Sequence, residues 1–344
     1  MARVVLITGV SRFLGAHLAG LLAADSGIDR VIGIDSQQPR RDDQARLGRT
    51  EFVRADIRNP LIAKVIAQAH VDTVVHLPVL GPQGRIAGKL PTKELTVVGT
   101  MQLLSACQRS ETVNRFVLRS TAAVYGSGPR DPAVFTEDMA AADSSQGGYA
   151  RDAVEIEGYL RGFARRRSDI TATILRFGTI IGPNIDTPLT RYLAMPVVPT
   201  SLGFDPRLQL LHDSDAVEVL RRAAVGEHPG VYNVAGEGVV TLSQVARRCG
   251  RVRLPVPAPA ISWAGAVVRN SGVQDVSAEQ AAFLNFGRVL DLTRLRTQFG
   301  YEPRYTTAQA LESYLRDRAG LPRLTTAAMR IVEAASVSLA RAAA

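Results

Sequence analysis

Short apolar runs alternate with helical patterns along the first half of the chain. The runs are continuously rich in Val, Ile and Leu, as strands are when helices cover both faces of a sheet. They cover residues 4–8, 31–35, 52–55, 73–77, 116–120 and 172–177. Because helical patterns separate them, we expect parallel strands joined by crossover helices. The pattern therefore predicts an α/β fold with a doubly wound parallel sheet.

The pattern loosens after Gly182-Pro183, where prolines become frequent. We therefore expect a larger first domain over residues 1–180 and a smaller lobe over 181–320, from which some segments return to the first domain. Residues 321–344 have helical composition and predict a basic helical tail. A frayed or docked helix is the favoured interpretation of 322–344. Contact with a membrane surface or a protein partner is the alternative.

The composition is that of a globular protein, with 46% hydrophobic and 21% charged residues among 344. No apolar run approaches the ~20 residues that span a bilayer, and the N-terminus enters the first strand without a leader pattern. We therefore expect a cytoplasmic protein. Cys107 and Cys249 have no neighbouring ligand pattern, which predicts reduced, buried thiols and no metal site.

The basic residues are almost all arginines. Lys64, Lys89 and Lys93 are the only lysines, so 38 of the 41 basic residues are Arg, and the net charge is +9. Clusters occur at residues 165–167, 221–222 and 247–253. Acidic residues are interleaved, and no nucleic-acid-binding motif or aromatic stacking pattern accompanies the clusters. We interpret these arginines as solvated surface, and nucleic acid as a disfavoured partner.

A glycine-containing turn follows the first strand. Thr8-Gly9-Val10-Ser11-Arg12-Phe13-Leu14-Gly15 opens a helix expected over residues 16–24. Such a turn presents backbone amides and a helix N-terminus to a pyrophosphate, with Gly9 for the tight turn and Gly15 for close packing. Asp35 ends the second strand, 20 residues after Gly15. Its carboxylate suits an adenosine ribose and repels a 2′-phosphate, which predicts NAD rather than NADP.

Arg40 and Arg41 lie close to Asp35 in sequence and weaken this preference for NAD. NADP is therefore the less favoured cofactor of the two.

The sequence resembles the extended short-chain dehydrogenase/reductase family, in its NAD-dependent epimerase/dehydratase branch, which includes UDP-glucose 4-epimerase. Beyond the glycine turn, the matching segments are residues 55–58, 75–77, 99–100, 120–126, 175–176, 232–234 and 299–301. The resemblance implies a Rossmann-type sheet with a smaller C-terminal substrate lobe, bound NAD and a nucleotide-sugar substrate. It also implies a homodimer formed through helices near residues 95–110 and 149–165.

The resemblance also implies roles for single residues at the cofactor. Gly9, Phe13, Leu14 and Gly15 would lie at the pyrophosphate, Asp35 at the ribose, and Asp56 and Ile57 beside the adenine. The alternatives are a plain turn at Gly9, a capping or solvated Asp35, and an Asp56 that starts a turn.

Arg12 stands where the family has its middle glycine. That glycine lets the backbone approach the pyrophosphate without a Cβ. The Arg12 guanidinium either binds the phosphates or fills the site and excludes the dinucleotide.

The proton-transfer site implied by the family is incomplete. Thr121 and Tyr149 occupy the positions of its Ser/Thr and Tyr, but Ala153 replaces the lysine one helical turn after the tyrosine. An ordinary tyrosine has a pKa of about 10, so it needs a nearby cation to release its proton near pH 7. Lys89 or Lys93 could supply one, and Tyr149 could equally be a capping or packing residue.

Two functions therefore remain open. The first is an NAD-dependent epimerase or dehydratase of nucleotide sugars, nominally UDP-sugars, that uses Thr121 and Tyr149. The second is a non-catalytic NAD-binding sensor or scaffold protein, indicated by Ala153.

Overall fold

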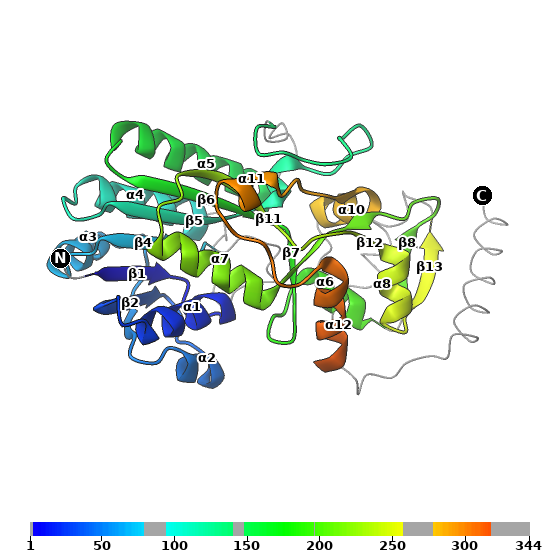
Figure 1. The fold of residues 1–344 in the computed structure, drawn as a ribbon, viewed down its shortest axis with the longest axis horizontal. Helices are drawn as coiled ribbons and strands as arrows, with labels where there is room; N and C mark the ends of the chain where they lie inside the picture. The colour runs from blue at the N-terminus through cyan, green and yellow to red at the C-terminus, as the bar shows by residue number, and fades with distance from the viewer. Residues whose placement is uncertain (1–2, 79–93, 140–147, 196, 257–277, 318–344) are drawn as a thin grey trace.

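The computed structural model describes residues 3–78, 94–139, 148–195, 197–256 and 278–317. Its centre is a seven-stranded sheet in the order β11-β6-β5-β4-β1-β2-β3, and every neighbouring pair is parallel (Figure 1). The strands are β1 (Val4–Thr8), β2 (Arg30–Asp35), β3 (Glu51–Arg54), β4 (Thr73–His76), β5 (Arg115–Thr121), β6 (Thr171–Phe177) and β11 (Gly230–Val234). The predicted Rossmann-type, doubly wound fold is confirmed, and so are the six predicted strands.

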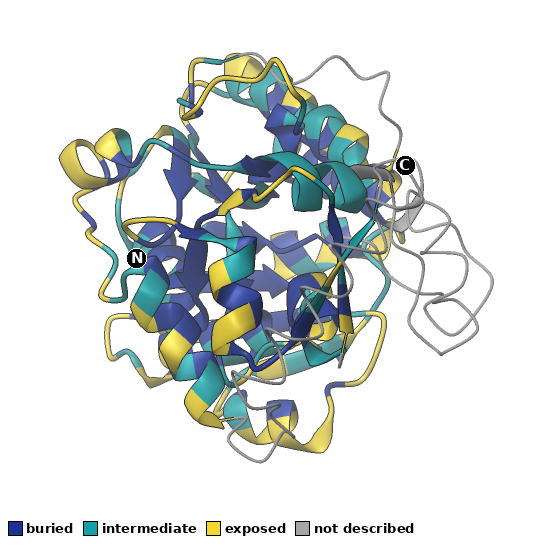
Figure 2. Cartoon of the chain, turned by 90° about the vertical axis from the view of Figure 1, so that its right-hand side faces the viewer, coloured by how far each residue is buried: buried dark blue, intermediate teal, exposed yellow. Residues whose placement is uncertain are grey.

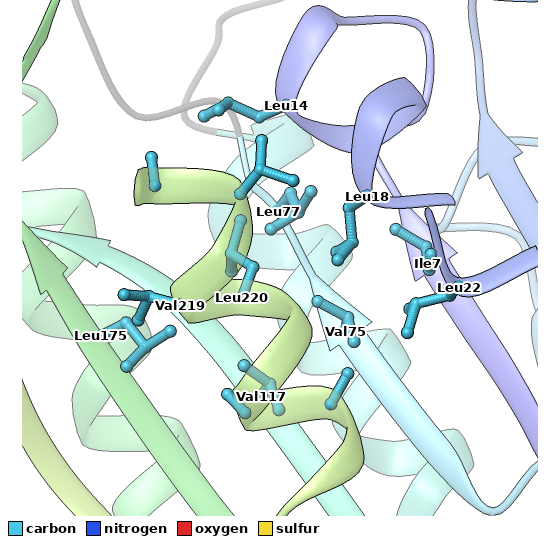
Figure 3. Close-up of a cluster of buried hydrophobic side chains, with 14 of the residues drawn as sticks. Ile7, Leu14, Leu18, Leu22, Val75, Leu77, Val117, Leu175, Val219 and Leu220 are labelled. Carbon is cyan, nitrogen blue, oxygen red and sulfur yellow. The ribbon is translucent and has the colours of Figure 1, made fainter. Parts of the chain in front are cut away.

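Helices cover both faces of this sheet because successive residues of a strand point to opposite sides. On one face, Ile7, Val75 and Val117 pack against α1 (Phe13–Ala24) and α7 (Asp213–Val225), as Figure 3 shows. On the other face, Leu6 and Phe116 pack against α3 (Leu61–Gln68), α4 (Gly99–Gln108) and α5 (Tyr149–Arg166). The short helix α2 (Arg41–Arg46) packs beside α1.

Most of the remaining elements form a smaller assembly at one end of the sheet (Figure 1). Its own apolar core includes Leu193, Leu208 and Leu311. Figure 2 colours the buried residues of the chain dark blue. The strands of this smaller assembly are β7 (Thr179–Ile181), β8 (Val197–Ser201), β9 (Arg207–Leu208), β10 (Leu210–His212), β12 (Val240–Thr241), β13 (Val252–Val256) and β14 (Gly287–Arg288). Its helices are α6 (Pro188–Ala194), α8 (Leu242–Arg248), α10 (Ala278–Phe286) and α12 (Thr307–Asp317). The short helix α11 (Thr293–Thr297) packs instead against β11 of the main sheet.

The helix α7 and the strand β11 follow residue 181 but belong to the main sheet. The tail expected over residues 321–344 lies outside the described residues. Within the described part of the chain, no helix has the length and apolarity needed to cross a membrane. Cys107 and Cys249 are buried thiols, as expected, and burial raises the pKa of Cys107 to about 12.

Several arginines bind backbone carbonyls at the ends of helices. Arg167 Nη1 donates to the carbonyls of Ser110 at 2.8 Å and Cys107 at 3.1 Å, beyond the last turn of α4. Arg49 binds the carbonyls of Ile28 at 2.7 Å and Asp25 at 3.2 Å after α1. Arg251, which is 3% exposed, donates to Leu193 O at 2.9 Å at the end of α6. The interpretation of the arginine clusters as solvated surface is therefore wrong for Arg167 and Arg251.

Replacing Arg167 with lysine should lower the free energy of unfolding by about 1–2 kcal/mol. A single ammonium cannot bind the several carbonyls that the planar guanidinium reaches, so carbonyls at the negative end of α4 lose their donors. Urea denaturation measures the change. Arg165→Lys, at an exposed position of α5, is the matched control and should leave stability within about 0.5 kcal/mol.

Candidate functional site

The turn between β1 and α1 is built around two glycines. Gly9 has φ +82°, and a Cβ there would lie 2.6 Å from Leu77 O. A Cβ on Gly15 would lie 2.3 Å from Gly9 O. Only glycine therefore lets the first turn of α1 approach the end of β1 and the loop after β4. The close approach leaves the helix N-terminus at the carboxyl edge of the sheet, where doubly wound proteins bind ligands.

Asp35 links the end of β2 to this turn. Its two carboxylate oxygens accept hydrogen bonds from Ser11 N and Gln37 N, both at 3.0 Å. A carboxylate offers about four acceptor sites, so these two bonds leave capacity for further donors. Asp35 therefore faces the glycine turn and fixes the backbone of the turn at Ser11. Its remaining acceptor sites could bind a ligand.

Arg12 is the N-cap residue of α1, and its side chain makes no capping hydrogen bond. Burial lowers the pKa of Arg12 and outweighs the carboxylate of Asp35, which acts to raise it. Arg12 is nevertheless exposed to solvent. The guanidinium is thus held at the same edge as the α1 N-terminus.

Phe13 and Leu14 are occupied with packing. The Phe13 ring has the Arg46 guanidinium 5.3 Å from its centroid and His17 edge-on at 5.3 Å. Leu14 lies beside Leu77 in the apolar cluster beneath the turn (Figure 3). These contacts fix the orientation of the first turn of α1.

Asp56 and Ile57 lie just after β3. Asp56 accepts a hydrogen bond from Arg58 N at 2.9 Å and forms an ion pair with the Arg58 side chain at 2.5 Å. Hydrogen bonding to the Arg58 side chain lowers the pKa of Asp56. Ile57 packs so closely on α4 that a Cβ on Gly99 would lie 2.6 Å from Ile57 Cδ1. Asp56 therefore does start a turn, which was one of the two sequence interpretations.

A buried polar chain ties β1, β4 and α4 together under the site. His76 Nδ1 lies 2.7 Å from Thr8 Oγ1, and His76 Nε2 lies 2.8 Å from Thr100 Oγ1. Thr100 donates its own proton to Thr96 O at 2.6 Å, so it accepts from His76 Nε2–H. Nδ1 then accepts from Thr8, whose oxygen in turn accepts from Leu77 N at 3.2 Å. Each hydrogen bond of this buried network therefore has one donor and one acceptor, and the His76 imidazole is neutral.

His76 should remain neutral well into the acid range, because burial lowers its pKa to about 3. In the unfolded chain it titrates near 6.5, so its contribution to stability is complete above that pH and declines as the pH falls toward 3. From pH 7 to pH 5 the loss from this group should be roughly 2 kcal/mol. Urea denaturation at both pH values checks this, and His76→Asn should flatten the dependence.

The carboxyl end of β5 carries Thr121, which lies half-buried and accepts a hydrogen bond from Ala123 N at 3.2 Å. This bond begins the 3₁₀ turn η2 (Ala122–Tyr125). Tyr149 is the first residue of α5, and that helix packs against η2. The end of β5 and the start of α5 are therefore neighbouring elements.

Ala153, one turn after Tyr149, is 1% exposed and packs in an apolar cluster with Ala122, Tyr125 and Phe135. Its methyl group supplies no charge to the start of α5. Lys64 is exposed on α3, whereas Lys89 and Lys93 lie outside the described residues.

Below this end of the sheet lies a buried ion pair. Glu157 of α5 accepts hydrogen bonds from Arg176 Nη2 at 2.7 Å and Nε at 3.0 Å, and from Ser120 Oγ at 2.6 Å. Both side chains are almost fully buried, at 1% and 3% exposure. Burial acts to lower the pKa of Arg176, but the hydrogen bonds and charge of Glu157 outweigh it and raise the pKa. The pair fixes α5 against β5 and β6.

Arg207 and Arg288 come from neighbouring strands of the small sheet β12-β9-β14. Arg288 donates to Gly126 O at 2.8 Å and to Ser127 Oγ at 2.9 Å, just after η2. It therefore connects the smaller lobe to the segment that follows Thr121.

Sequence analysis missed Arg119, which precedes Thr121 by two residues on β5. Its Nη1 donates to Pro78 O at 3.4 Å, and its buried Nε has no hydrogen-bond partner among the described residues. Burial, together with the smaller effect of the Arg12 charge, lowers the pKa of Arg119 to about 10. The signal in the sequence was an arginine interrupting an otherwise apolar strand, Phe116-Val117-Leu118-Arg119.

The chain is similar to several known proteins in sequence and in fold. An uncharacterized protein of Mycobacterium tuberculosis is 46% identical over 339 residues, which are 98% of this chain and 90% of that protein. UDP-glucuronic acid 4-epimerase from Bacillus cereus, solved with UDP-glucuronic acid and NAD, is similar with a TM-score of 0.69 and 20% identity, covering 93% of this chain and 100% of that one.

The dTDP-glucose 4,6-dehydratase of Bacillus anthracis, solved with NAD, gives a TM-score of 0.68 at 18% identity and covers 93% of this chain and 97% of its own. At such identities the likeness shows the fold. The profile described as "NAD dependent epimerase/dehydratase family" matches residues 5–235, two-thirds of the sequence. The chain therefore belongs to the NAD dependent epimerase/dehydratase family.

Proposed function

We propose that the protein binds NAD at the β1–α1 turn and acts on nucleotide sugars, nominally UDP-sugars, as an epimerase or dehydratase. The observation that carries the proposal is the close approach of Gly15 to Gly9, which places the N-terminus of α1 at the carboxyl edge of the sheet. Of the structural neighbours, the Bacillus cereus epimerase was solved with UDP-glucuronic acid and NAD, and the Bacillus anthracis dehydratase with NAD. NADP is the less favoured cofactor because Asp35 faces the turn.

Each group has a defined task in this proposal. The backbone of Gly9 to Gly15 and the α1 N-terminus bind the pyrophosphate, Asp35 accepts from the ribose, and Asp56 and Ile57 border the adenine. Bound NAD would supply the hydride-transfer chemistry. Thr121 and Tyr149 exchange a proton with the sugar hydroxyl that is oxidised.

The second candidate function is an NAD-binding sensor or scaffold without turnover. The observation that favours it is Ala153, which packs in an apolar cluster where the family lysine would stand. Loss of a group that tunes the acid or base typically costs about 10²- to 10⁴-fold in rate.

One set of assays separates the two functions. Wild type, Tyr149→Phe and Ala153→Lys are titrated with NAD by calorimetry and then assayed with a panel of UDP- and dTDP-sugars. Turnover by the wild type that is lost in Tyr149→Phe supports the enzyme. NAD binding without turnover supports the sensor, and turnover gained only in Ala153→Lys identifies a decayed enzyme. Tyr159→Phe, on the same helix and hydrogen-bonded to Glu155, is the matched control.

A protein that binds neither NAD nor NADP in thermal-shift and calorimetric assays would contradict both functions. It would indicate instead that Arg12 fills the site.

A further inference from the structure

Arg119 lies on the same face of β5 as Thr121, the last residue of that strand. Arg119 is paired with Leu175 of β6. Thr121 is paired with Phe177. Leu175 and Phe177 both belong to the apolar cluster that packs against α1 and α7, where Figure 3 shows Leu175. Because paired residues point to the same side of a sheet, Arg119 and Thr121 lie on that side, with Cα atoms about 6–7 Å apart.

The guanidinium of Arg119 reaches the carboxyl edge of the sheet. Its Nη1 donates to Pro78 O at 3.4 Å, and Pro78 follows the end of β4 by two residues. Pro78 is next to Leu77, whose carbonyl oxygen would lie 2.6 Å from a Cβ on Gly9. The guanidinium and the glycine turn therefore both contact residues 77–78.

The positive charge of Arg119 is not matched by a carboxylate among the residues that the structure describes. The charge that acts on its pKa is that of Arg12, which is also positive. On the other face of β5, Glu157 binds Arg176 and Ser120. Because the pKa of Arg119 is about 10, its guanidinium stays protonated near pH 7. The end of β5 therefore carries a fixed positive charge beside Thr121.

The proposed function brings the reacting ring of NAD to this part of the edge. Thr121 takes part in moving the proton of the hydroxyl that is oxidised, so that hydroxyl lies within about 3 Å of Thr121 Oγ. The carbon that bears the hydroxyl must come within about 3–3.5 Å of the ring atom that takes up the hydride. The ring then lies near the Arg119 guanidinium, which shares the face of Thr121.

We propose that Arg119 makes the site prefer the reduced cofactor, NADH, over the oxidised form, NAD⁺. The nicotinamide ring is positively charged in NAD⁺, and uptake of a hydride, which brings two electrons and one proton, removes that charge. A fixed guanidinium therefore repels the oxidised ring and not the reduced one. At a separation of about 10 Å and an effective dielectric constant of about 20, Coulomb's law gives a preference of about 10-fold.

The inference rests on the proposed binding of NAD and deepens it, and it has a consequence under either candidate function. In an epimerase, weaker binding of NAD⁺ than of NADH favours removal of the hydride from the sugar carbon, while the hydroxyl proton passes to Thr121 or Tyr149. In a sensor, the same preference makes occupancy of the site follow the reduced form.

Calorimetric titration of the full chain with NAD⁺, NADH and ADP-ribose tests the inference. The ratio of the dissociation constants of NAD⁺ and NADH should fall about 10-fold in Arg119→Gln. Arg119→Lys keeps the charge and should retain most of the wild-type ratio. ADP-ribose lacks the nicotinamide ring and should bind the wild type and both variants with the same affinity.

Arg115→Gln is the matched control. Arg115 lies on the same strand and face at the opposite end of β5, where it donates to Ala224 O at 3.4 Å. Its replacement should leave the ratio of the two dissociation constants at the wild-type value. Circular dichroism melts of each variant establish that it is folded.

The outcomes separate this inference from the proposed function. A ratio that is equal in wild type and Arg119→Gln overturns the inference and leaves the binding of NAD standing. Equal losses of affinity for all three ligands would place Arg119 at the phosphates and also overturn it. A ratio that falls in Arg119→Gln, in a protein without turnover, supports the inference and contradicts the enzymatic function. If the wild type binds none of the three ligands, both are wrong.

Discussion

Replacing Gly15 with alanine should destabilise the protein by about 3 kcal/mol and abolish NAD binding. The added Cβ would lie 2.3 Å from Gly9 O and 2.9 Å from Val10 Cα, and both are backbone atoms that no rotamer change can move. The helix must therefore shift away from β1, and overpacking of this kind costs roughly 1–3 kcal/mol or more. Urea denaturation measures the stability, and calorimetry with NAD measures the site.

The matched control is Gly158→Ala on α5, another glycine inside a helix. Gly158 is exposed, and a Cβ there would meet nothing within 4 Å. Alanine is favoured over glycine in a helix by about 1 kcal/mol, so this variant should be slightly more stable than the wild type and bind NAD equally. A Gly15→Ala protein with wild-type stability and NAD affinity would contradict the close approach that we describe.

Replacing Glu157 with glutamine should lower the free energy of unfolding by about 3–5 kcal/mol. The substitution leaves the buried guanidinium of Arg176 without its counter-charge, and an uncompensated buried charge is among the most destabilising changes in proteins. Because Glu157 also binds Ser120, the end of β5 loses its attachment to α5. Chemical denaturation of the purified variant gives the magnitude.

An exposed ion pair provides the comparison. Arg30 and Glu51 form two hydrogen bonds of 2.7 Å but are 44% and 51% exposed, so Glu51→Gln should cost less than about 1 kcal/mol. The double variant Glu157→Gln with Arg176→Met should recover part of the loss, because it removes the unpaired charge. If Glu157→Gln and Glu51→Gln cost the same free energy of unfolding, burial does not determine the cost of breaking an ion pair in this protein.

Much of the fold was predictable because continuous apolar strands have a clear signature. The six strands from Val4 to Phe177 were found within a residue or two at each end. The seventh, β11, was not, since Gly-Val-Tyr-Asn-Val is short and half polar. Its Asn233 is buried and donates to Phe135 O at 3.1 Å, a long-range contact that local patterning cannot reveal.

The candidate site was predictable where backbone geometry dictates residue type. Gly9 and Gly15 have the close contacts that their spacing indicated. The buried position of Arg119 beside Pro78 was not predictable, because it depends on the pairing of β5 with β4. The arginine caps at Arg49 and Arg167 were missed for the same reason, because their carbonyl partners lie up to 60 residues away.

The position of β11 at the edge of the sheet has a consequence for biosynthesis. The strand β6 ends at Phe177, and β11 begins at Gly230, so about 50 residues must leave the ribosome before β6 receives its outer neighbour. At about 5–20 residues per second this takes roughly 3–10 s. During that time the nascent chain presents an unpaired strand edge, which can pair with other chains. A fragment that stops near residue 180 would retain this open edge permanently and should be prone to aggregate.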